Sequence, residues 1–206
     1  MASRGIDDQI ASAVLSESEY ERARVERFSH FKQPLHKKLA WLGGLMAALA
    51  LVLPIYGAYP AASEAYLPST APGAASPKAV LLGVAGGGVV VLSAVLLLGA
   101  AGYRIGKAPV NRSQAHTILN VEDFAAYLGF GTGGLAILLT LGYFLLGAAG
   151  DGAIEGYMAL MRTTNPFAAS GLGVTVTHLG IGAFLASVGL LAAQAYVRFR
   201  LRDLPT

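Results

Sequence analysis

Polar and apolar residues of this 206-residue chain are separated into long blocks. Four largely apolar segments cover residues 39–59, 79–103, 124–150 and 171–197, and none of them contains Asp, Glu, Lys or Arg. An α-helix needs about 20 apolar residues to cross a hydrocarbon core roughly 30 Å thick. Lipid offers the backbone no hydrogen-bond partner, and the alternating pattern of a membrane β-barrel is absent, so each segment predicts a transmembrane helix.

The pattern therefore predicts an all-α fold, a polytopic membrane protein built as a four-transmembrane-helix bundle. Composition agrees, because the chain is 54% hydrophobic and 13% charged, against about 25% charged residues in soluble domains. We expect a basic tail over residues 1–38, the transmembrane domain over 39–197 and a short tail over 198–206. The polar start of the chain does not resemble a cleavable signal peptide, so the first span is expected to act as the insertion signal.

Most basic residues lie on one side of this topology. The chain has 15 Lys and Arg residues, and all except Lys78 and Arg162 fall before the first segment, between the second and third, or after the fourth. Cytoplasmic loops are enriched in Lys and Arg, so both termini and the middle loop are expected in the cytoplasm. We expect a multi-pass protein of the cell (plasma) membrane. The bias toward Ala, Gly, Leu and Val, with more Arg than Lys, is typical of prokaryotic proteins.

The N-terminal tail predicts a helix before the first span. Ser16 with Glu19, or Ser18 with Glu21, matches a capping box. Beyond this cap, apolar residues alternate with Arg and Lys, which indicates a basic amphipathic juxtamembrane helix ending near Pro34. A solvated helix that sets topology is the favoured interpretation; binding to the anionic inner leaflet or to a cytosolic partner are the alternatives.

The remaining connections carry local predictions. Residues 60–78 contain four Pro residues among Ala and Ser, which is typical of an irregular external loop. After the third span, four apolar residues recur at helical spacing and predict a short interfacial helix: Ile154, Tyr157, Met158 and Met161. Asn120 is expected to cap the third span, with Glu122 and Asp123 as helix-end charges. Pro54 is expected to kink the first span.

Glycine is frequent, with 26 residues in the chain. Small residues four positions apart let membrane helices approach closely, so that packing holds them together. The predicted packing faces contain Gly83, Gly87, Gly129, Gly133 and Gly182. Packing within the bundle is the favoured interpretation, and docking onto another subunit or another copy is the alternative. A weak similarity between the two halves also leaves open a duplicated helical hairpin.

His178 is the candidate ionisable group within the spans. Counted from Ser170 at 1.5 Å per residue, it is expected roughly 12 Å inside the outer boundary. Thr175 and Thr177 lie beside it in the sequence, and Gln194 lies further along the same span. A structural hydrogen bond to a hydroxyl or carbonyl group is the favoured role, with contact to a quinone, substrate or proton, or ligation of a metal, as alternatives.

No catalytic, cofactor-binding or metal site is predicted. The chain has no cysteine, which excludes disulfides and thiolate chemistry, and its histidines do not supply two opposed intramembrane haem ligands. Phosphate-binding loops, zinc-protease spacing and nucleophile elbows are absent. Nothing indicates nucleic-acid binding, because the positive charge is explained by the topology.

Three functional hypotheses remain. Bare spans, glycine-rich faces and short loops favour a non-catalytic membrane subunit that scaffolds, anchors or assembles a larger membrane complex. The alternative is a small homo-oligomeric transporter or channel for an ion or small solute, with polar residues of the fourth span lining a pore between copies. The third is an intramembrane enzyme or redox subunit. Expected partners are the lipid bilayer and other membrane subunits or copies of the chain.

Overall fold

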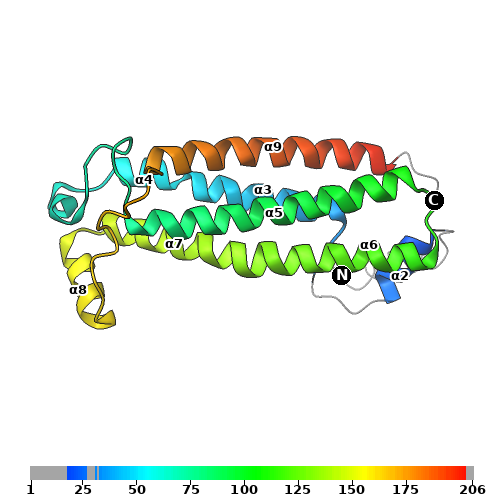
Figure 1. Cartoon of the computed structure of the whole chain (residues 1–206), viewed down its shortest axis with the longest axis horizontal. Coiled ribbons are helices and arrows are strands. Elements are labelled where there is room, and N and C mark those ends of the chain that lie inside the picture. Colours follow the sequence, from blue (N-terminus) through cyan, green and yellow to red (C-terminus); the bar gives the residue numbers. More distant parts are fainter. Residues whose placement is uncertain (1–17, 27–30, 32, 203–206) are drawn as a thin grey trace, which may run out of the picture.

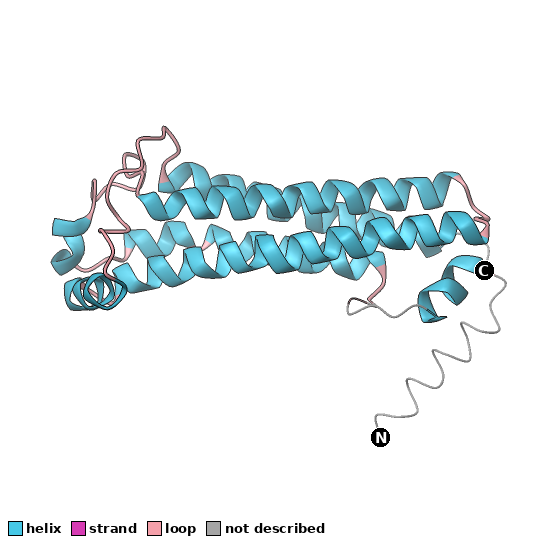
Figure 2. Ribbon diagram, turned by 60° about the horizontal axis from the view of Figure 1, so that its bottom comes forward, coloured by secondary structure: helices cyan, strands magenta, loops and turns pink. Residues whose placement is uncertain are grey.

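The computed structural model describes residues 18–26, 31 and 33–202. This part of the chain is helical and contains no β-strand, apart from one isolated bridge between Pro77 and Ala169. Four helical stretches are long and apolar enough to cross a membrane: Leu35–Gly57, Lys78–Gly106, Arg112–Ala148 and Val176–Arg202. They lie alongside one another in Figures 1 and 2. The four predicted apolar segments are thus confirmed as helices, with shifted ends.

The first stretch consists of α3 (Leu35–Ala50) and α4 (Val52–Gly57), and the second is α5 (Lys78–Gly106). The third combines α6 (Arg112–Ala126), the π-helix η2 (Tyr127–Gly133) and α7 (Gly134–Ala148), and the fourth is α9 (Val176–Arg202). The most extensive contact joins α3 to α9, while α5 packs along the whole third stretch. The first and fourth stretches are therefore neighbours, although they are far apart in the sequence. This is the arrangement expected when four helices run up and down and close into a bundle.

The two ends of the helices differ (Figure 1). At the basic end, the end of α5, the start of α6 and the end of α9 carry Arg104, Arg112 and Arg202, and the short helix α2 (Glu19–Glu26) lies beside them. At the far end lie α4, the 3₁₀-helix η1 (Ala61–Tyr66) and α8 (Asp151–Met161). These arginines are therefore gathered at one end of the long axis.

The outer surface of the long helices is apolar. Val95, Leu138 and Leu185 on three different helices are 59%, 62% and 63% exposed. Soluble monomers rarely expose such large continuous apolar areas, because water would have to hydrate them. The interior is closely packed around Leu39, Leu49 and other buried side chains. This distribution suits a chain surrounded by hydrocarbon.

The first stretch is interrupted at Leu51, between α3 and α4. Pro54 has no N–H group, so it leaves the carbonyl of Ala50 without its helical donor. Gly180 of α9 packs closely here: a Cβ atom on it would lie 2.6 Å from Leu53 Cβ and 3.5 Å from the Ala50 oxygen. The interruption expected from Pro54 therefore falls three residues earlier, at Leu51, where the glycine on α9 leaves space for it.

The third stretch begins twelve residues before the predicted span. Asn111 caps it: its side chain accepts from Gln114 N, and the Gln114 side chain accepts from Asn111 N. The prediction that Asn120 caps this helix, with Glu122 and Asp123 as end charges, is wrong, because the helix is already formed there. The stretch has 37 residues, or about 55 Å, so part of it exceeds a 30 Å hydrocarbon core.

The far end is more ordered than predicted. The segment 60–78 contains η1 and is tied to the later loop, since Lys78 N donates to Ala168 O over 2.9 Å and Ser170 N to Ser76 O over 2.8 Å. Ser63 Oγ donates to Gly147 O over 2.8 Å, which fixes η1 on the end of α7. The predicted helix after the third span is confirmed as α8.

Candidate functional site

The amphipathic face of α6 brings an acidic side chain into the protein. Ala115, Ile118 and Leu119 recur at helical spacing and are at most 3% exposed. Glu122 follows Leu119 by three residues and Ile118 by four, so it lies on the same face. It is completely buried. The apolar periodicity of α6 is thus what carries this carboxylate inward.

Two side chains from other segments satisfy Glu122. The Tyr20 hydroxyl of α2 donates to Glu122 Oε1 over 2.6 Å, and Lys38 Nζ of α3 donates to Oε2 over 3.2 Å. Tyr20 and Lys38 are 0% and 2% exposed. Asp123 Oδ1 lies 3.8 Å from the same amine. We call Tyr20, Lys38 and Glu122 the Glu122 cluster; it joins α2, α3 and α6.

Lys38 occupies the first turn of α3, where the helix dipole disfavours a positive charge. The carboxylate of Glu122 offsets this effect and the loss of hydration. In a buried ion pair, removing one partner is strongly unfavourable because it leaves the other charge unpaired. This ion pair therefore holds the start of α3 against the second half of α6.

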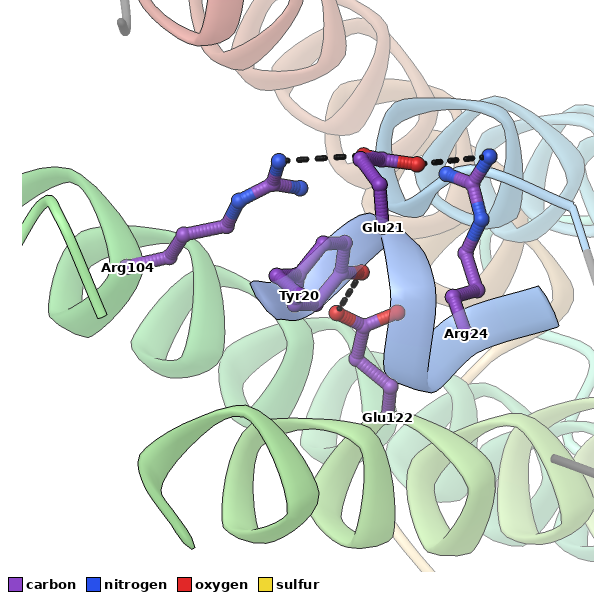
Figure 3. A network of polar contacts seen from close by, with 5 residues as sticks. All are labelled: Tyr20, Glu21, Arg24, Arg104 and Glu122. Atoms are coloured by element: carbon purple, nitrogen blue, oxygen red, sulfur yellow. Dashed lines mark hydrogen bonds and ion pairs between the residues drawn. The ribbon is translucent and has the colours of Figure 1, made fainter. Parts of the chain in front are cut away.

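A second set of contacts surrounds Tyr20 (Figure 3). Arg104 from α5 places its guanidinium carbon 3.6 Å from the centre of the Tyr20 ring. The same guanidinium lies 3.1 Å from Glu21 Oε1, and Arg24 lies 2.9 Å from Glu21 Oε2. Arg104 thus binds α2 both by cation–π attraction to Tyr20 and by an ion pair to Glu21. Side chains of both α5 and α6 therefore hold this helix.

The electrostatics of Tyr20 favour a neutral phenol. Burial raises its pKa well above 10.0, and the negative charge of Glu122 and the hydrogen bond to it raise it further, while Arg104 and Arg24 oppose this effect. The hydroxyl therefore remains protonated and donates to the carboxylate. This arrangement is suited to fixing α2 in place, since each polar atom of the cluster is used in a contact within the chain.

No metal-binding arrangement of three or more His, Cys, Asp or Glu residues occurs within the described ranges. Three of the four predicted polar residues of the fourth span, Thr175, Thr177 and His178, lie at its far end and not deep within it. α9 begins at Val176, so His178 is in its first turn and exposed. Its Nδ1 lies 3.1 Å from Thr175 Oγ1, while Thr177 N donates to Pro72 O over 3.3 Å. Gln194 is half-buried in the second half of α9 and is not brought near His178.

The predicted glycine faces divide into inward and outward positions. A Cβ atom on Gly83 would lie 2.7 Å from Leu179, and one on Gly129 would lie 2.9 Å from the Ser93 side chain. A Cβ atom on Gly87 would lie 3.2 Å from the Leu49 side chain, and one on Gly133 would lie 2.8 Å from the Val90 side chain. Gly182 faces outward, with nothing within 4 Å of a Cβ atom.

The Glu122 cluster was not predicted. The sequence places Glu122 at a helix end, Lys38 in the basic tail and Tyr20 in an amphipathic helix, and nothing in these patterns joins the three. A usable indication existed for Glu122: extending the apolar period of Ala115, Ile118 and Leu119 places it on the buried face. No local pattern indicates which residues of α2 and α3 would meet it.

Comparisons with models of protein families, with curated proteins and with solved structures find no match for this chain.

Proposed function

We propose that this chain is a non-catalytic integral subunit of a membrane complex, which it scaffolds or anchors through its outer surfaces. The four long helices form a bundle across the cell membrane, and the basic end, with both termini, faces the cytoplasm. The concentration of Lys and Arg at one end of the helices supports this orientation, since cytoplasmic segments are enriched in these residues.

One observation carries the proposal: the space between the helices is closed by direct packing. A Cβ atom on Gly86 of α5 would lie 2.8 Å from Ala136 Cβ, and one on Gly133 would lie 3.2 Å from Gly86 O. Backbones this close leave no room for a solute between α5 and the third stretch at the level of Gly86 and Gly133. Ile137 of α7, and Leu39 and Leu49 of α3, are completely buried in the interior.

The hydroxyl groups of the interior support the same conclusion. Ser93 Oγ donates to Val89 O over 2.9 Å, and Thr140 Oγ1 donates to Ala136 O over 2.8 Å. Both are bonds to the preceding turn of their own helix, which satisfy a hydroxyl in an apolar setting. Ser187 Oγ of α9 instead donates to Gly43 O of α3 over 2.9 Å, and so joins two helices. These groups are occupied and do not form a polar path.

Outward glycines support a role for the outer surface. Gly88 on α5, Gly142 on α7 and Gly182 and Gly189 on α9 have nothing within 4 Å of an added Cβ atom. Glycine weakens a helix relative to alanine, and these positions bring no compensating contact with the residues that the structure describes. Close approach of a helix from another protein is what small residues allow in membranes.

The test is to purify the full chain from its native membranes in a mild detergent and to determine the mass and composition of the particle. We expect a membrane protein in fixed stoichiometry with the chain. Gly182→Leu, Gly142→Leu and Gly88→Leu each enlarge one outward face. The substitution at the interface is expected to reduce recovery of the partner, and the other two serve as matched controls.

A lone monomer, or recovery that none of the three substitutions changes, would contradict the proposal. A particle made only of copies of this chain, with ion or solute flux in liposomes above that of empty vesicles, would favour a homo-oligomeric transporter instead.

A further inference from the structure

A cleft of about 360 Å³ opens at the basic end, beside the Glu122 cluster. Its walls come from α2, the start of α3, the end of α5 and the end of α9: Glu21, Arg24, Pro34, Leu35, His36, Arg104, Arg198, Leu201 and Arg202. This size is at the lower end of the range of about 300–1,000 Å³ for small-molecule pockets. Residues from both ends of the described chain meet around it.

The charge of the cleft is strongly one-sided. Among the residues that the structure describes, four arginines line it, and Glu21 is the one acidic residue. Glu21 is already shared between Arg24 and Arg104. Within the described part of the chain, Arg198 and Arg202 have no carboxylate within ion-pair distance. The cleft therefore has guanidinium groups in excess of the carboxylate that faces them.

The geometry points to a binding site for a phosphate-bearing anion, and we propose that its occupant is the headgroup of an anionic phospholipid. A guanidinium group binds two phosphate oxygens at once through paired N–H donors, whereas a lysine ammonium acts only as a point charge. A cluster of arginines is therefore well suited to a phosphate group. Arg198 and Arg202 are four residues apart on α9, so both lie on the same face of the helix.

The position of the cleft favours a lipid over a soluble phosphate. Leu35 and Leu201 line it together with the arginines, and it lies where the apolar spans end. A headgroup at this height has its acyl chains beside the exposed apolar surface of the helices, such as Leu191 of α9, which is 43% exposed. This step rests on the proposed placement of the basic end at the cytoplasmic leaflet, whose anionic lipids attract basic segments.

The experiment measures lipid retention on the isolated full chain by native mass spectrometry in detergent. The probes are phosphatidylglycerol, zwitterionic phosphatidylcholine and soluble glycerol phosphate. The test variant is R198Q with R202Q, and the matched control is Arg200→Gln, which lies on the same helix but does not line the cleft. Helicity of each variant is checked by circular dichroism.

We expect phosphatidylglycerol to be retained over phosphatidylcholine. The double variant is expected to lose affinity by roughly thirtyfold, the factor that corresponds to about 1 kcal/mol for each arginine, while R200Q changes little. Competition by glycerol phosphate at equal affinity would overturn the lipid and assign the cleft to a soluble phosphate compound. Equal losses in R200Q and the double variant, or equal retention of the two lipids, would overturn the site itself. None of these outcomes depends on a protein partner, so they are separate from the test of the subunit role.

Discussion

Tyr20 and Glu122 are 102 positions apart in the sequence, yet the Tyr20 hydroxyl donates a 2.6 Å hydrogen bond to Glu122 Oε1. This bond attaches α2 to the side of α6, at the basic end of the molecule. Lys38 completes the contact from α3. Much of the basic end is thus organised around a single buried carboxylate.

Removing Lys38 is expected to destabilise the fold strongly. Lys38→Ala leaves the carboxylate of Glu122 buried without its ion-pair partner, and such losses cost about 3–5 kcal/mol. Replacing the whole cluster by apolar residues of similar volume, K38M with E122L and Y20F, is expected to recover most of this loss because neither a charge nor an unpaired hydroxyl remains buried. Thermal and denaturant unfolding in detergent micelles measures both effects.

The exposed pair of Arg112 and Glu26 is the control for this prediction. These side chains are 70% and 63% exposed and lie 3.5 Å apart. Arg112→Ala is expected to change the free energy of unfolding by less than about 1 kcal/mol, as is usual for solvated pairs. If K38A is no more harmful than R112A, the Glu122 cluster does not hold the basic end together.

Tyr20 is expected to make stability depend on alkaline pH. Its pKa in the folded state lies well above 10.0, the value for an unperturbed phenol. The folded state therefore binds the phenolic proton more tightly than the unfolded state does. This contribution is fully present below pH 10 and is lost as the pH rises from 10 toward the folded pKa.

Tyr20→Phe removes this titration, so its unfolding temperature is expected to fall less steeply above pH 10 than that of the parent chain. At neutral pH the same variant loses about 1–3 kcal/mol, because one oxygen of Glu122 is left without its donor. Tyr196→Phe, at a 62% exposed position, is the control for both effects. Parallel pH profiles of Y20F and the parent chain would count against a protonated, buried Tyr20.

Neighbouring glycines of α5 are expected to respond in opposite ways to alanine. A Cβ atom on Gly86 would lie 2.8 Å from Ala136 Cβ and 3.2 Å from Gly133 O, so α5 must move away from the third stretch. Overpacking of this kind costs about 1–3 kcal/mol. Gly88 is two residues further along and has open space, so Gly88→Ala is expected to leave the unfolding temperature unchanged or to raise it.

The sequence is sufficient to predict the elements whose physics is local. Long apolar segments predict the four helices, and the spacing of Ile154, Tyr157 and Met158 predicts α8. Helix ends are less predictable, because the amphipathic helix α6 extends the third stretch to before the start of its apolar segment. Its cap at Asn111 depends on the reciprocal contact with Gln114, which competes with an equally plausible cap at Asn120.

The Glu122 cluster could not be predicted, because its partners meet only when the helices are packed. Nothing in the residues around Tyr20 distinguishes a phenol that points toward lipid from one that donates to a carboxylate. The burial of Lys38 likewise depends on where α2 lies relative to the start of α3. Among the predicted glycines, Gly83 and Gly182 have the same local pattern, and the structure alone shows that one faces inward and the other outward.

The proposed orientation can be tested with single cysteines, because the natural chain contains none. Ser113 is exposed at the start of α6, Thr70 is exposed in the far-end loop, and Leu185 is 63% exposed in the middle of α9. In intact cells, a membrane-impermeant maleimide is expected to label Thr70→Cys and not Ser113→Cys. After the cells are opened, both positions should react. Leu185→Cys should stay unreactive in both cases, because thiols in hydrocarbon do not ionise to the reactive thiolate. Labelling of Ser113→Cys in intact cells would place the basic end outside, against the positive-inside rule, and labelling of Leu185→Cys would remove α9 from the lipid.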